Sequence, residues 1–370
     1  MKRFFFSSIA LMVAMTACTE SGLIDAPEFY GNPIVFDTYI GKTPVTKAEN
    51  CNIEALKAAE NNGGGARIYA FEPDKEAQIP FSAVNYDSHY LNGKLLFANP
   101  SWGYYEGSSL VDAYMPVDKD LAVVAYSLNA GISTDESEFT FTVNNNVANQ
   151  VDFLVTPLTL VTENVTGGDT KVPLRFYHLL SRVGFKVQSS NESEDEIVIS
   201  SVKLMGSFPT TGNIDLTAST AKPSSSKPDE TNIALQSKKP QITPNANGTT
   251  VAEYELLPGN DNVFQITAAA CYTEPQQITP EEGGCYMMIM PGVQSAPSVQ
   301  ITYKVGNAAG EETVTINLAD LNTGITYFEA GYAYEFLFKV STSAIEFSAE
   351  IPTDWDETGA DIPVTPTPNV

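Results

Sequence analysis

The sequence has little positive charge and little histidine, and each shortage excludes a class of function. Its 370 residues include 20 lysines and arginines against 45 acidic residues, for a formal net charge of −25. Because proteins bind nucleic-acid phosphates with clustered Lys and Arg, this balance excludes a nucleic-acid partner. Two histidines, His89 and His178, are too few for a histidine-based metal site.

Motifs for catalysis are also missing. The chain has no nucleophile elbow, no phosphate-binding glycine loop and no zinc signature. Acidic residues are numerous, but nothing in the sequence places two of them together as a glycosidase pair. His178 stands beside apolar residues, which is typical of a structural histidine. We therefore expect no enzyme activity, no cofactor and no bound metal.

A nearly unbroken apolar stretch, interrupted only by Ser7 and Ser8, stands at the start of the chain. Two basic residues precede the apolar residues 4–15, and small residues and then Cys18 follow them. This order is typical of a secretory signal, and the stretch is shorter than the roughly 20 residues of a membrane-spanning helix. The cysteine resembles the lipidated residue of a bacterial lipobox, which predicts a signal peptide over residues 1–17 and a lipid on Cys18. The alternative is a plain secretory signal with an incidental cysteine.

Three cysteines remain if Cys18 carries a lipid, and two of them border predicted strands. Cys271 and Cys285 could form a disulfide in an oxidising compartment, with Cys51 left over. Their spacing alone does not decide whether they are bonded, because a disulfide depends on the distance between the two backbones.

Most of the remaining sequence consists of predicted strands separated by turn residues. Apolar and polar residues alternate in many short runs, which is the pattern of half-buried strands. The predicted strands are residues 33–40, 66–71, 121–126, 139–143, 151–155, 182–187, 196–204, 263–269, 286–290, 298–305, 312–318 and 332–340. One short helix is predicted over residues 51–62, followed by three glycines. Many short strands favour an all-β protein made of sandwiches.

A break in the pattern near residues 156–170 predicts two domains. This stretch contains Pro157 and two consecutive glycines, and it follows a complete strand. The predicted parts are a signal peptide (1–17), a lipidated linker (18–32), an N-terminal β-sandwich (33–165), a C-terminal β-sandwich (166–350) and a tail (351–370). The tail holds four prolines, which exclude it from the centre of a sheet.

Several landmarks follow one another in order along the chain. They are the lipobox, a strand followed by a basic residue (33–48), ARIYAFEP (66–73), LLFANPSWGYYEG (95–107), AYMPVDKDLAVVAYS (113–127), VDFLVTP (151–157), VPLRFYHLLSRVGFKV (172–187), MMIMPG (287–292) and GYAYEFLFKVSTSAIEFSAEIPTDW (331–355). With these the chain resembles the fimbrillin family of Bacteroidales, whose members are subunits and accessory proteins of type V pili. The resemblance implies two tandem transthyretin-like β-sandwich domains. It also implies a lipid-anchored precursor in the outer membrane that later becomes part of a fimbrium on the cell surface.

The resemblance further implies assembly by strand exchange. A trypsin-like maturation protease would cut between Lys47 and Ala48, with Lys42 as a weaker second site. The first strand would then leave, and a strand of another pilus subunit would take its place by β-strand addition. The residues of the displaced strand that share one face are Ile34, Phe36, Thr38 and Ile40. The alternative is that Lys47 is an ordinary linker lysine and that the protein is an uncut tip or accessory subunit.

An aromatic cluster offers a different function. Trp102, Tyr104 and Tyr105 lie beside glycines, and exposed aromatic rings stack on sugars. The protein could then be a monomeric outer-membrane surface lipoprotein, or a pilus tip, that binds a host or bacterial surface glycan or protein. The other interpretation is that these side chains pack in the core, as aromatic residues of strands usually do.

Overall fold

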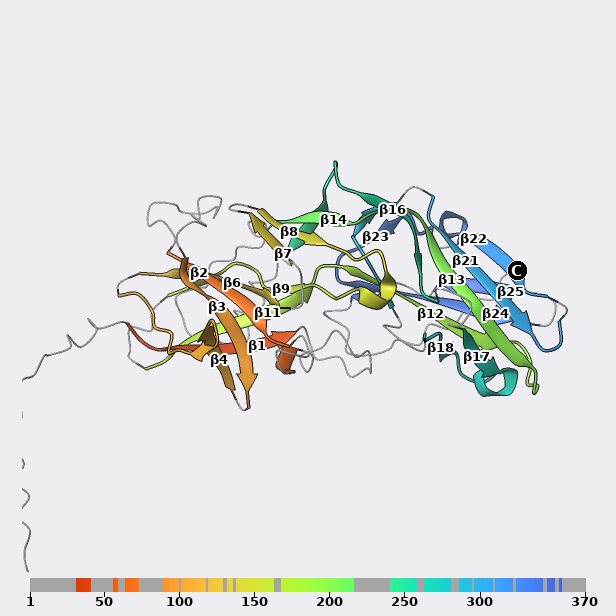
Figure 1. Cartoon of the computed structure of the whole chain (residues 1–370), viewed down its shortest axis with the longest axis horizontal. Helices are drawn as coiled ribbons and strands as arrows, with labels where there is room; N and C mark the ends of the chain where they lie inside the picture. Colours follow the sequence, from red (N-terminus) through yellow and green to blue (C-terminus); the bar gives the residue numbers. More distant parts are fainter. Residues whose placement is uncertain are drawn as a thin grey trace, which may run out of the picture.

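The computed structural model is built almost wholly from β-strands, which confirms the predicted all-β fold. Its two largest groups of strands lie toward opposite ends of an elongated molecule (Figure 1). The structure describes residues 31–40, 56–58, 64–72, 89–99, 101–117, 119–128, 132–135, 138–162, 168–215, 240–257, 263–280, 286–294, 296–308, 310–321, 324–341, 345–349 and 353–354.

The first group is a nine-stranded sheet with the order β1-β11-β9-β6-β2-β3-β4-β5, in which β10 also pairs with β6. Its strands are β1 (Ile34–Ile40), β2 (Ala66–Phe71), β3 (His89–Ala98), β4 (Ser101–Glu106), β5 (Ser109–Leu110), β6 (Leu121–Ser127), β9 (Leu154–Val155), β10 (Thr159–Val161) and β11 (Thr170–His178). The pairing of β1 with β11 is parallel, and the other pairings are antiparallel. The sheet is curled, so its two ends approach each other. The Phe36 ring of β1 therefore lies near the Tyr104 ring of β4.

The second group is a β-sandwich of a six-stranded and a five-stranded sheet. The first of these sheets contains β12 (Ser181–Ser189), β18 (Gln276–Gln277), β19 (Tyr286–Ile289), β24 (Tyr332–Val340), β25 (Ile345–Ala349) and β26 (Thr353–Asp354). The other contains β13 (Glu196–Pro209), β16 (Thr250–Glu255), β17 (Phe264–Thr267), β21 (Ser298–Val305) and β22 (Glu312–Asn317). Alternating apolar residues of β12 and β24, such as Phe185 and Phe336, stack within the core between the sheets.

Two smaller sheets complete the fold. A four-stranded sheet joins β7 (Ile132–Asp135) and β8 (Glu138–Thr142) to β14 (Thr211–Asp215) and β15 (Gln241–Pro244). A two-stranded sheet is formed by β20 (Gly292–Val293) and β23 (Tyr327–Phe328). Single turns of 3₁₀-helix occur at η3 (Val147–Asn149), η6 (Ala268–Cys271) and η7 (Leu318–Asp320). The four-stranded sheet therefore joins β7 and β8 to two strands that follow β13 in the chain.

Within the described part of the chain, buried apolar side chains form two separate clusters. The smaller cluster lies inside the curled nine-stranded sheet, and its described members lie between Ile34 and Phe176. The larger one begins with Tyr69 and Phe71, on the other face of β2, and continues into the second sandwich as far as Val340. Because β2 contributes to both clusters, each face of this strand is buried, which explains why its sequence is almost continuously apolar.

Several strand predictions match the structure residue for residue, including β2, β21 and β24. Others differ: the predicted strand over residues 151–155 shrinks to β9, and β3, β14 and β16 were not predicted. Of the predicted helix, the structure describes residues 56–58, and Leu56 and Lys57 are helical. No helix in the described ranges is long and apolar enough to cross a membrane.

Candidate functional site

The strand β1 shows the alternation expected of the predicted displaced strand. Ile34, Phe36 and Thr38 are 8%, 5% and 8% exposed and point into the curled sheet. Val35 is 38% exposed and Asp37 is exposed, so the opposite face meets solvent. Ile40 belongs to β1 as predicted, but its side chain lies outside the described residues. The edge strand β1 therefore covers the smaller apolar cluster with its apolar face.

Beside β1, on the same face of the sheet, lies a row of alternate side chains of β11. Phe36 lies in register with Val172, Thr38 with Leu174, and the backbone of Ile40 with Phe176. All three of these β11 side chains are fully buried. Removing β1 would therefore uncover a continuous apolar groove along β11.

Backbone hydrogen bonds fix which way the peptide groups of β1 point. The Pro33 carbonyl accepts from the Thr170 N–H at 2.7 Å, toward β11. The Ile34 N–H donates to the Ala113 carbonyl at 2.8 Å, on the opposite side. Because peptide groups alternate along a strand, the odd-numbered residues of β1 bond to β11, and the even-numbered residues turn their N–H groups away from it. The residues with buried side chains are therefore the ones whose N–H groups do not pair with β11.

Tyr104 of β4 supports the buried face of β1. Its ring centroid lies 6.4 Å from that of Phe36. The Tyr104 hydroxyl accepts from the Asn92 N–H and donates to Glu106 Oε1, each at 3.2 Å. Burial is the main cause that raises the pKa of Tyr104 to about 12. A Cβ atom at Gly93 would lie 2.4 Å from this ring, so a glycine is required where the ring crosses β3.

Comparison with known proteins identifies the family of the chain. A family model described as fimbrillin-like matches residues 60–355, which is most of the sequence. This chain belongs to the fimbrillin-like family. No curated protein matches the sequence.

Two solved structures share the fold of this fimbrillin-like chain at low sequence identity. One is a fimbrial protein from Bacteroides vulgatus, with 15% identity, a TM-score of 0.53, and coverage of 87% of this chain and 99% of that one. The other is a candidate cell adhesion protein from Bacteroides uniformis, with 16% identity, a TM-score of 0.51, and coverage of 88% and 98%. At such low sequence identities, the similarity establishes a shared fold and nothing further.

The three aromatic residues considered for ligand binding do not form one surface in this fimbrillin-like chain. Tyr104 is 3% exposed, so it belongs to the core and cannot face a ligand, which corrects that part of the prediction. Trp102 is half-buried and packs edge-on against Phe97, with centroids 5.4 Å apart. Tyr105 points to the other face of β4, since neighbours in a strand alternate. A shared stacking platform for a sugar is therefore absent at these three residues.

Several predicted positions lie outside the described residues. They are Cys18, Lys47, Ala48, Cys51, Cys285 and the tail beyond residue 354. Lipidation and cleavage at these positions stay predictions. Cys271 is described: it is a buried free thiol, and burial raises its pKa. The structure therefore contains no disulfide at Cys271.

The connection between the nine-stranded sheet and the second sandwich holds polar contacts that the sequence did not predict. His178, at the end of β11, places Nδ1 2.6 Å from Asp152 Oδ2, and both side chains are buried. The buried Gln150 accepts from the Met288 N–H of β19 at 2.7 Å. His178 is fully buried at this position, where the sequence predicts a structural histidine. These contacts bind the connecting segment to strands on both sides.

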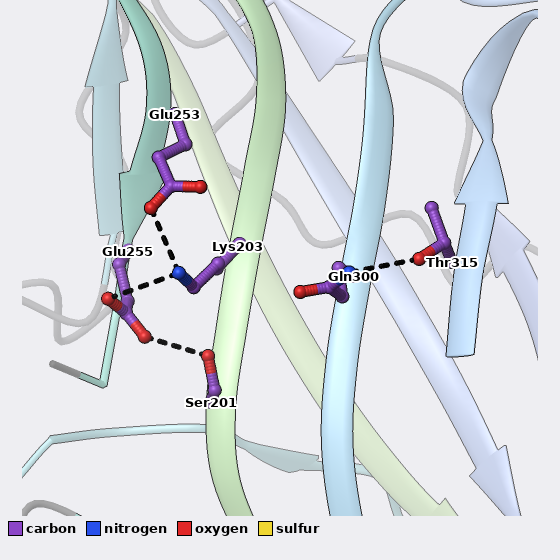
Figure 2. A network of polar contacts seen from close by, with 6 residues as sticks. All are labelled: Ser201, Lys203, Glu253, Glu255, Gln300 and Thr315. Atoms are coloured by element: carbon purple, nitrogen blue, oxygen red, sulfur yellow. Dashed lines mark hydrogen bonds and ion pairs between the residues drawn. The ribbon is translucent and has the colours of Figure 1, made fainter. Parts of the chain in front are cut away.

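The outer face of the five-stranded sheet carries a network of polar side chains (Figure 2). Lys203 of β13 lies 2.9 Å from Glu253 and 3.7 Å from Glu255 on β16. The hydrogen bond with Glu253 is the main cause that raises the pKa of Lys203. Ser201 donates to Glu255 at 2.8 Å, and across β21 and β22 Gln300 donates to Thr315 at 3.1 Å. These contacts join side chains of neighbouring strands, so the network strengthens strand pairing.

Proposed function

We propose that this fimbrillin-like protein is a stalk or tip subunit of a type V surface pilus and joins its neighbours by exchanging β1. One observation supports the proposal above all: β1 ends its sheet and buries alternate side chains beside the apolar side chains of β11. An extended peptide that replaces an edge strand gains main-chain hydrogen bonds, and pockets for alternate side chains select its sequence.

The proposed route begins with export as a lipoprotein. The lipid on Cys18 holds the precursor in the outer membrane, and a trypsin-like protease cuts between Lys47 and Ala48. Burial of a side chain such as Ile34 or Phe36 contributes about 1.5–3 kcal/mol. Because cutting the chain leaves these contacts in place, β1 stays bound until a strand of another subunit displaces it.

The C-terminal tail of a second copy suits the incoming strand. If the tail is extended, one of its two faces carries the even-numbered residues Ile362, Val364, Pro366 and Pro368. In the groove, that face is the buried one, whose N–H groups turn away from β11. Two of the three prolines of this segment would therefore cost no hydrogen bond to β11, and only Pro363 would lack one. Deleting residues 361–370 should abolish polymer formation and leave the monomer folded.

Strand pairing also suggests where the two domains divide. The predicted boundary at residue 165 would assign β11 to the second sandwich, whereas β11 pairs with β1 and β9 in the nine-stranded sheet. The next strand, β12, pairs with β24 and β19 in the second sandwich. We place the boundary between His178 and Ser181. With that division, the groove lies wholly within the N-terminal domain.

Limited cleavage tests the proposed function. Trypsin treatment of the purified protein should yield a new N-terminus at Ala48 and larger species on size exclusion. Lys47→Gln should stay uncut there and monomeric, and the matched control Lys42→Gln should behave like the wild type. If the wild type keeps β1 and its monomer size under all cleavage conditions, the assembly route is wrong.

A further inference from the structure

One side chain on the buried face of β1 does not suit its surroundings. Thr38 is 8% exposed, and its hydroxyl has no hydrogen-bond partner within the described part of the chain. Other buried threonines bond their hydroxyls: Thr156 accepts from the Ala125 N–H, and Thr210 donates to the Thr249 carbonyl. Thr38 is therefore a weak point on an otherwise well-packed strand.

The apolar character of its surroundings makes this hydroxyl costly. Thr38 lies opposite Leu174 and two residues from Phe36, and both side chains belong to the smaller cluster. A buried hydroxyl without a partner loses its hydrogen bonds to water and gains none in exchange. A valine has almost the same shape and carries no such loss.

We propose that Thr38 makes β1 the weaker occupant of its groove, so that an incoming strand with an aliphatic residue at this position displaces it. This inference rests on the proposed strand exchange and names the chemistry of the partner: an extended segment with apolar residues on one face and no buried hydroxyl at the position of Thr38. The incoming strand pairs with the same edge of β11, so the side chains that it buries decide how well it competes with β1.

Competition between peptides tests the proposal on the full-length protein after cleavage at Lys47. Two synthetic peptides of residues 31–42 are compared, one with the natural sequence and one with Thr38→Val. We expect the Thr38→Val peptide to displace the bound N-terminal segment at about tenfold lower concentration, which corresponds to about 1.4 kcal/mol. A full-length Thr38→Val variant should release its own segment about tenfold more slowly than the wild type. Equal behaviour of the two peptides, or of the two proteins, would overturn the proposal.

A matched control separates this effect from general changes in β-propensity. Val35→Thr exchanges the same two residue types on the solvent-facing side of β1 and should leave release of the segment unchanged.

If no variant and no peptide ever causes release, the proposed exchange itself fails. Thermal unfolding of the uncut proteins then still decides the role of Thr38. Thr38→Val must raise the Tm by a few degrees, and an unchanged Tm would overturn the inference.

Discussion

Replacing Phe36 with alanine should destabilise the uncut protein and have no effect on the processed one. Phe36 is 5% exposed, lies next to Val172 in the sheet, and its ring is near that of Tyr104. Truncating a buried phenylalanine costs about 3–5 kcal/mol, because apolar contact is lost and a cavity remains. At the lower figure, the Tm should fall by about 6–12 °C, since each 1 kcal/mol shifts the Tm of a domain of this size by about 2–4 °C.

Processing supplies an internal control for this prediction. Once β1 has been cut off and replaced, Phe36→Ala and the wild type are the same molecule and must unfold identically. Val35→Ala changes the exposed face of β1 and should cost no more than about 0.5 kcal/mol. Urea and thermal unfolding before and after cleavage measure all three proteins. An unchanged uncut Phe36→Ala protein, or an equal loss in Val35→Ala, would show that β1 does not plug the groove.

Three further predictions concern single side chains. Burial raises the pKa of Tyr104 from 10.0 to about 12, so between these pH values this hydroxyl ionises only in the unfolded chain. The free energy of unfolding should therefore fall as the pH rises through this window. Tyr104→Phe should weaken that fall, as measured by urea unfolding. Gln150→Ala leaves the buried Met288 N–H without its partner and should cost about 1–3 kcal/mol in urea unfolding, whereas Asn149→Ala, at an exposed neighbour, should cost little. Cys271 should react with a thiol reagent only after unfolding, and rapid labelling of Cys271 itself in the native protein, located by peptide mapping, would contradict its burial.

Local sequence patterns predicted much of the fold. Alternation alone predicted β21 and β24 with their observed bounds, because the period of a strand depends only on neighbouring residues. It also identified the buried face of β1 through Ile34 and Phe36. The strand β3 was missed because its sequence, HYLNGKLLFA, has a glycine and two polar residues near its centre that weaken the alternation.

The sequence by itself determined the all-β class, the acidic surface and which side of β1 is apolar. Only the tertiary structure decided that β1 pairs in parallel with β11, that Asp152 meets His178 and that Tyr104 lies under Phe36. These contacts join residues far apart in the chain, and they depend on how the sheet curls and which edges then meet. Local periodicity contains no information about that choice, because every edge strand offers the same row of peptide groups.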